Sequence, residues 1–145
     1  MIGRIKKFDE ELYNKYDVPA RELMKKILGT CVSDNPDIYK EDMILNMENS
    51  KYKYLELQVC TNWISDKYPY EKPFVYARKK LFSDKTLFVI LNRHMTCCLL
   101  FDQKSLLAKP RRLKRYSRTF VYEVPWYRVI QTDLDDLPEI IPQYF

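Results

Sequence analysis

Residues 52–60 read YKYLELQVC and decide the fold, because polar and apolar side chains alternate along a run rich in strand-forming types. Successive side chains of a strand point to opposite faces, so the two leucines share one face while Glu56 and Gln58 share the other. The stretch therefore predicts a β-strand that carries a carboxylate and an amide side by side.

The flanking sequence places this strand in a larger sheet. Apolar residues 43–45 (MIL) and polar residues 46–50 precede it, which predicts a β-hairpin. Further strands are expected at residues 74–81, 86–91, 96–101 and 119–124. We therefore expect an α/β (or α+β) protein with a mixed central β-sheet flanked by helices, and a single domain over residues 1–145.

A helix is expected upstream of the sheet. Apolar residues recur at helical spacing from Phe8 to Leu28, and Pro19 interrupts them. The pattern predicts a short helix, a break, and a second helix from Pro19 to Leu28, with Asp17 as its N-cap and Gly29 as its C-cap.

Composition excludes several function classes. The chain of 145 residues has only 2 Gly and 1 His, so a P-loop, a dinucleotide-binding loop and a zinc site with two histidines are excluded. No G-x-S-x-G elbow supports serine-hydrolase chemistry. Without a long apolar run or a signal-peptide core, and with four cysteines expected to stay reduced, we expect an intracellular protein, cytoplasmic or nuclear, with no membrane contact.

The net charge of +5 is unevenly distributed. Residues 103–128 hold eight basic residues against one acid, whereas residues 129–145 hold four acids and no base. A dense basic segment suits the phosphates of nucleic acid, which we favour, and the alternative is a solvated loop balanced by the acidic residues that follow. The acidic residues are expected to form an extended C-terminal arm. The candidate nucleic-acid-binding residues are Lys109, Arg111, Arg112, Lys114, Arg115 and Arg118.

Two acidic positions can pair with the carboxylate of the central strand. Asp42 directly precedes the first strand of the hairpin, and Asp37 lies five residues earlier in a turn-like segment. Because neighbouring strands lie about 5 Å apart, either acid could meet Glu56 across the hairpin. We favour Asp42. Two carboxylates at this separation suit Mg²⁺ or Mn²⁺, and Gln58 on the same face could orient a water molecule. The alternative is that Glu56 and Gln58 line a solvent-exposed face.

Residues 36–37 (PD), 42–45 (DMIL) and 54–59 (YLELQV) together resemble the PD-(D/E)xK nuclease superfamily, which has the restriction-endonuclease-like fold. Its pattern is an acid, a hairpin, and then (D/E)-x-K on the next strand. The resemblance covers residues 17–61 and implies a preceding helix, in which Glu22 could be a further acid. Gln58 stands where the pattern has lysine. Some members of the superfamily with glutamine at this position are active, and others with an altered lysine are inactive.

The resemblance also implies a second core helix after the third strand, which the sequence does not show clearly. The basic triplet Arg78, Lys79 and Lys80 follows that region, and one of the three could face a phosphate, although surface solvation is the commoner outcome. His94 is expected in a turn, and Trp63 and Trp126 are expected to pack in the core or at its rim rather than to stack on bases. The low glycine and high tyrosine content also resembles proteins of large DNA viruses.

These observations lead to two functional hypotheses. The first is a metal-dependent nuclease-like protein that hydrolyses phosphodiester bonds in DNA, with Asp42 and Glu56 as ligands of Mg²⁺ or Mn²⁺ and with Gln58 at the reacting water. The second is a catalytically inactive module that binds nucleic acid or a protein. The oligomeric state is left open, and a homodimer is one alternative.

Overall fold

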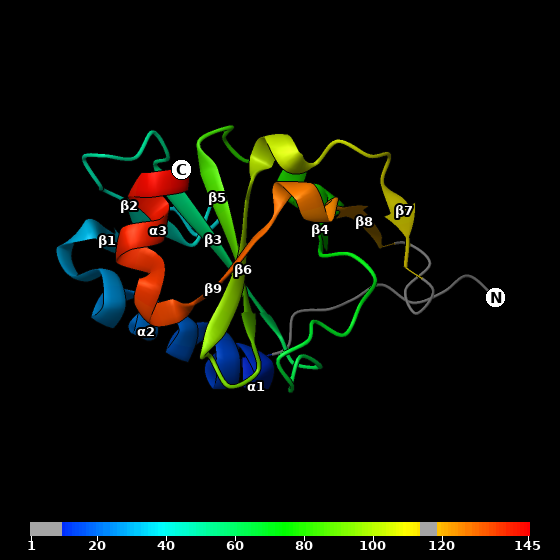
Figure 1. Ribbon diagram of the computed structural model, residues 1–145, viewed down its shortest axis with the longest axis horizontal. Helices are drawn as coiled ribbons and strands as arrows, with labels where there is room; N and C mark the ends of the chain where they lie inside the picture. Colours follow the sequence, from blue (N-terminus) through cyan, green and yellow to red (C-terminus); the bar gives the residue numbers. More distant parts are fainter. Residues whose placement is uncertain (1–9, 114–118) are drawn as a thin grey trace.

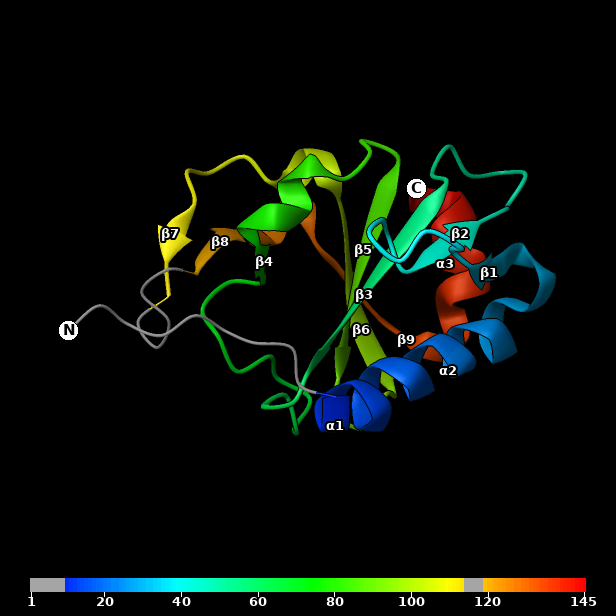
Figure 2. The same cartoon turned by 180° about the vertical axis from the view of Figure 1, so that it is seen from behind.

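The computed structural model describes residues 10–113 and 119–145, and a six-stranded mixed sheet forms the centre of this part (Figures 1 and 2). The strand order is β1-β2-β3-β5-β6-β9. The predicted mixed α/β architecture, with a mixed sheet and flanking helices, is confirmed. The strands are β1 (Val32–Asp34), β2 (Met43–Leu45), β3 (Tyr54–Cys60), β5 (Thr86–Asn92), β6 (Cys97–Asp102) and β9 (Ile130–Asp133).

The strand expected over residues 52–60 is β3, which lies inside this sheet. It pairs antiparallel with β2, with Met43 opposite Leu55, and this confirms the predicted hairpin. On its other side it pairs parallel with β5 over its full length, so that Glu56 lies opposite Phe88. A parallel pair requires a long crossover connection, and residues 61–85 provide it.

Part of this crossover belongs to a second, three-stranded sheet with the order β4-β8-β7. Its strands are β4 (Phe74–Tyr76), β7 (Arg111–Arg112) and β8 (Phe120–Glu123). The predicted strand over residues 74–81 is therefore only partly correct. The ladder with β8 ends at Tyr76, and residues Ala77–Leu81 turn into a 3₁₀ segment, η3.

The N-terminal helical region is continuous, contrary to the predicted break. It runs from α1 (Glu10–Leu12) through a π-helical segment (Tyr13–Asp17) into α2 (Val18–Leu28). Pro19 lies in the first turn of α2, where its missing N–H is best tolerated. Asp17 is itself helical and makes no capping bond, so the N-cap prediction is wrong. Gly29 ends the helix with φ of 58°, as expected.

The acidic C-terminal segment is not an extended arm, and that expectation is wrong. Its first residues form β9 beside β6, and the next form the helix α3 (Leu137–Tyr144). Leu137 and Ile141 are fully buried, so burial of an apolar helix face outweighs the proline content. Across the described ranges, 10–113 and 119–145, no helix is long and apolar enough to cross a membrane.

The two faces of the large sheet pack against different layers. One, called here the helix face, carries alternate strand residues such as Leu55, Leu87 and Leu100 against α2 and α3. The other, called here the small-sheet face, packs residues such as Phe88 and Phe101 against Trp63 and Val75. Figures 1 and 2 show the helices and the small sheet on opposite sides of the large sheet.

Candidate functional site

Asp42 and Glu56 lie side by side across the β2–β3 hairpin, and each carboxylate accepts a backbone N–H from the other side of the hairpin. The Asp42 N–H donates to Glu56 Oε1 at 3.1 Å, and the Leu57 N–H donates to Asp42 Oδ2 at 2.9 Å. This reciprocal arrangement arises because Asp42 is the residue just before β2, one position beyond the Met43–Leu55 pair. The structure thus brings the favoured aspartate next to the strand carboxylate.

Asp37, the alternative acid, lies elsewhere. Its N–H donates to Asn35 Oδ1, and its own Oδ1 accepts the Tyr39 N–H at 3.0 Å. These are the local contacts of an exposed turn. Glu22, the further acid that the resemblance implies, is also exposed and pairs with Lys25 at 3.2 Å.

A lysine from the crossover completes the site. Lys79 Nζ lies 3.0 Å from Glu56 Oε2, and the two side chains are only 5% and 9% exposed. Lys79 belongs to η3, directly after β4, so the small sheet positions it over the small-sheet face of β3. The sequence suggested surface solvation as the commoner outcome for the basic triplet. For Lys79 the structure shows a buried ion pair instead.

The ionisation of Glu56 is strongly affected by this environment. Burial raises the pKa of Glu56, the Lys79 ammonium opposes that rise, and the nearby Asp42 carboxylate adds to it. The net result is a pKa of about 7. A carboxyl group that titrates near neutrality in a buried charged cluster is characteristic of functional sites, although structural ion pairs show it too.

Gln58 lies two residues beyond Glu56 on the same face of β3. Its Nε2 donates to the Phe74 carbonyl at 3.3 Å, which ties it to β4. Its Oε1 is buried and has no hydrogen-bond partner. Because buried polar atoms almost always have partners, this acceptor points to a missing donor or cation. The alternative of a solvent-exposed face does not hold for Glu56, which is 7% exposed.

Arg21 of α2 is a further cation whose charge interacts with that of Asp42. Arg21 bonds to the Tyr13 hydroxyl. Burial lowers the pKa of Arg21, but the bond to Tyr13 and the charges of Asp34 and Asp42 raise it by more. The positive charge of Arg21 therefore lies within electrostatic reach of Asp42.

Oxygen ligands for a metal could come from Asp42, Glu56 and Gln58. Within the described parts of the chain, no three His, Cys, Asp or Glu side chains gather into a group that could hold a metal ion. Two carboxylates and an amide oxygen still match what Mg²⁺ takes, since this ion usually keeps several water ligands. The unpartnered Gln58 Oε1 fits such a donor set.

The basic segment is described in part. Arg111 and Arg112 form β7, where Arg111 Nε pairs with Glu123 at 3.0 Å and the Arg112 guanidinium lies 5.7 Å from the centroid of the Phe120 ring. Lys109 is exposed just before this strand. The other three candidates, Lys114, Arg115 and Arg118, lie outside the described residues.

Sequence reasoning missed the roles of Lys79 and Arg21. The triplet around Lys79 was visible, but nothing local distinguishes Lys79 from the exposed Arg78 beside it. Arg21 had no signal beyond its place in the predicted helix. Comparison with family models, with curated proteins and with solved structures finds no match to this chain.

Proposed function

We propose that this protein is a metal-dependent nuclease-like enzyme that hydrolyses phosphodiester bonds in DNA. The observation that carries the proposal is the buried Glu56–Lys79 pair beside Asp42. The order of α2, the acid before β2, the hairpin and the Glu-x-Gln strand also follows the pattern that the PD-(D/E)xK resemblance implies. The stretch between β3 and β5 departs from it, because strand β4 and the turn η3 stand where the superfamily has a helix.

Lys79 supports the proposal because it supplies a cation that the strand itself lacks. The pattern expects a lysine two residues after the acid, and this chain has Gln58 there. Lys79 places its ammonium 3.0 Å from Glu56 from a different element. A positive charge at this point stabilises negative charge that develops on a phosphate or on an attacking water.

Each residue of the site has a separate role in the proposed reaction. Asp42 and Glu56 would hold Mg²⁺ or Mn²⁺, which would supply a Lewis acid for the phosphate and for a reacting water. Gln58 Oε1 accepts a hydrogen bond from the attacking water and orients it. The exposed cations Lys109 and Arg112 bind the DNA backbone. The proposal places the protein inside the cell, where its cysteines stay reduced.

A second candidate function is a catalytically inactive module that binds nucleic acid or a protein. The observation that favours it is that both Glu56 oxygens already have partners, Lys79 and the Asp42 N–H, while the side chain is almost fully buried. In such a module the ion pair is a structural bridge between β3 and η3. Metal dependence separates the two functions.

The test is DNA cleavage with Mg²⁺ or Mn²⁺ by the wild type and by two glutamate variants. Glu56→Gln should reduce cleavage to background, while the matched control Glu22→Gln, at an exposed acid, should cleave like the wild type. A second matched pair, Asp42→Asn and Asp37→Asn, should lose and keep activity respectively.

Metal binding provides an independent readout. Mn²⁺ should raise the melting temperature of the wild type, because bound metal stabilises the folded state, and Glu56→Gln should abolish the rise. Gln58→Lys should preserve or increase cleavage, since it restores the commoner pattern. If Mn²⁺ neither binds to the wild type nor supports cleavage by the wild type or by Gln58→Lys, the enzyme proposal is rejected in favour of the inactive module.

A further inference from the structure

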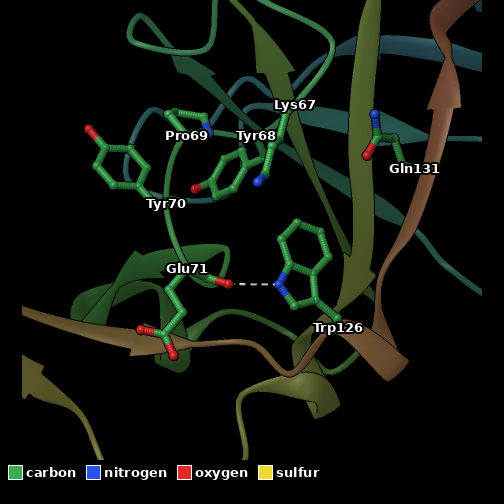
Figure 3. Close-up of a pocket in the computed structure, with 7 residues that line it drawn as sticks. All are labelled: Lys67, Tyr68, Pro69, Tyr70, Glu71, Trp126 and Gln131. Carbon is green, nitrogen blue, oxygen red and sulfur yellow. Dashed lines mark hydrogen bonds between the residues drawn. The ribbon is translucent and has the colours of Figure 1, made fainter.

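An open pocket lies beside the small-sheet face, apart from the carboxylates. Its volume is about 480 Å³, and it is lined by residues 67–71 of the β3–β4 connection together with Trp126 and Gln131 (Figure 3). Trp126 lies in the 3₁₀ turn after β8, and Gln131 lies in β9. This size is within the range of sites that bind small molecules.

Three aromatic rings form the wall of the pocket. Tyr68 packs edge-on against Tyr70 at 5.7 Å and against Trp126 at 5.8 Å between ring centroids. Tyr68 is buried, but Trp126 and Tyr70 are 42% and 40% exposed. The Trp126 Nε1 donates to the Glu71 carbonyl at 2.7 Å, which fixes the orientation of the indole (Figure 3). A stacking surface is therefore held in place before any ligand arrives, which lowers the entropic cost of binding.

The polar groups of the pocket suit a neutral ring with both donors and acceptors. Lys67 contributes an ammonium and Gln131 an amide, while Glu71 turns its carbonyl toward the indole and its carboxylate away from it (Figure 3). The Tyr68 hydroxyl is buried and has no hydrogen-bond partner. Two basic side chains would favour a phosphate, and an acid without a cation would favour an alkylammonium ligand. The mixed set matches neither, whereas a nucleobase presents a planar face and a polar edge.

The pocket connects to the candidate catalytic site through direct contacts. The Tyr70 ring packs on the Phe74 ring at 5.4 Å between centroids, and the Phe74 carbonyl accepts the Gln58 amide at 3.3 Å. Gln58 shares its strand face with Glu56. The pocket wall and the candidate catalytic site are therefore joined through Phe74.

We propose that this pocket binds one unpaired nucleobase, stacked on Trp126, and so directs the protein to DNA with single-stranded character. The inference rests on the proposed function for its substrate class, DNA. It adds a preference that the carboxylate site alone does not imply. A base inside a duplex cannot reach the pocket without leaving the stack, which costs a few kcal/mol, whereas a base in a single strand is already free.

The test measures binding in EDTA, so that no cleavage is required. A short labelled single-stranded oligothymidylate and a blunt duplex are titrated into wild type, Trp126→Ala, Trp126→Phe and the matched control Tyr127→Ala. Tyr127 is the next residue, is 80% exposed and does not line the pocket. Trp126→Ala should weaken single-strand binding about tenfold and leave duplex binding unchanged, because one base–aromatic stack is lost. Trp126→Phe should retain most of the affinity, and Tyr127→Ala should bind like the wild type.

Tryptophan fluorescence gives a direct readout of stacking. Of the two tryptophans, Trp63 is fully buried and Trp126 is partly exposed, so quenching by the oligothymidylate should come from Trp126. Unchanged single-strand affinity in Trp126→Ala overturns the inference. Quenching by a peptide rich in tyrosine and proline, but not by the oligothymidylate, also overturns it and assigns the pocket to a protein partner.

These outcomes are separable from those of the nuclease proposal. Stacking on Trp126 without metal-dependent cleavage would reject the catalytic proposal and keep the pocket. Cleavage that requires Glu56, with the same substrate preference in Trp126→Ala as in the wild type, would reject the pocket and keep the catalytic proposal.

Discussion

The two faces of the large sheet differ in what their buried strand residues are. On the helix face they are apolar, as at Leu55, Leu87 and Leu100. On the small-sheet face the buried strand residues include Glu56, Thr86 and Asn92. Strand residues on both faces are buried almost completely, as at Leu55 and Phe88, so burial alone does not explain the difference. The helix face buries apolar side chains, and the small-sheet face buries the Glu56–Lys79 ion pair beside an apolar core of its own.

The small-sheet face also holds the unsatisfied polar groups. The three buried side-chain atoms without partners in the described part of the chain are Gln58 Oε1, Trp63 Nε1 and Tyr68 OH. Trp63 and Tyr68 belong to the core of that face, and Gln58 alternates onto it from β3. Since each such atom costs about 1–3 kcal/mol when it stays unpaired, this polar cost of folding falls on the small-sheet face.

The largest effect on unfolding free energy is expected when the Glu56–Lys79 ion pair of the small-sheet face is broken. Lys79→Ala leaves the Glu56 carboxyl buried without its cation, which should cost about 3–5 kcal/mol of unfolding free energy above pH 7. At pH 5 the cost should shrink, because Glu56 can then take up a proton. Urea denaturation at both pH values measures it. The exposed neighbour provides the control: Arg78→Ala should stay within about 0.5 kcal/mol of the wild type.

The helix face should respond to cavity formation alone. Leu100→Ala removes a fully buried side chain from that core and should cost about 2–5 kcal/mol. This loss should be the same at pH 5 and pH 8, since the described core cluster is apolar apart from Tyr52, Cys31 and Cys98, and burial raises the pKa of Tyr52 and of Cys98. Equal pH dependence for Leu100→Ala and Lys79→Ala would contradict the distinction between the faces.

The ionisation of Glu56 and the ionisation of Asp102 should change the unfolding free energy in opposite directions as pH rises. The pKa of Glu56, raised by burial to about 7, exceeds that of the unfolded chain, so unfolding free energy should fall as pH rises from about 4.5 to about 7. Burial acts to raise the pKa of Asp102 as well, but hydrogen bonds from Ser105 and Tyr52 and the charge of Arg128 lower it overall. Its contribution should therefore be lost only as pH falls below about 4.

An NMR pH titration of the metal-free protein measures the pKa of both carboxyl groups. It follows the chemical shifts of their carboxyl carbons. Glu56 should show a midpoint near 7 and Asp102 one below its ordinary value of 3.8. A Glu56 midpoint near 4.5 would show that Lys79 outweighs burial. The small-sheet face would then hold an ordinary ion pair.

The smallest effects are expected for basic residues in and just before β7, the edge strand of the small sheet, and they concern the salt dependence of DNA binding. Lys109→Ala and Arg112→Ala should each reduce the salt dependence of duplex binding by about 0.9 in the slope of log K against log salt, if each contacts one phosphate. Arg111→Ala should change the slope less, because Glu123 already neutralises Arg111 at 3.0 Å. Binding is followed by fluorescence anisotropy at several salt concentrations. Unchanged slopes for all three variants would remove β7 from the DNA interface.

Local sequence determined the elements whose signal is carried by consecutive residues. The alternation over residues 52–60 gave β3 and the faces of its side chains, and the helical spacing before Gly29 gave α2. The pairing of Asp42 with Glu56 also followed, because the register of a hairpin depends only on residues close in the chain.

Only the tertiary structure decided which polar residues meet. Strand β4 pairs with β8 across some 45 residues of chain, and this non-local pairing places Lys79 over Glu56 and Phe74 over Gln58. In the same way, the contact of the C-terminal segment with β6 and α2 turned an expected arm into β9 and α3. The physical reason is that periodicity reports which side of an element is buried. The groups buried against that side come from remote segments whose local sequence carries no record of the contact.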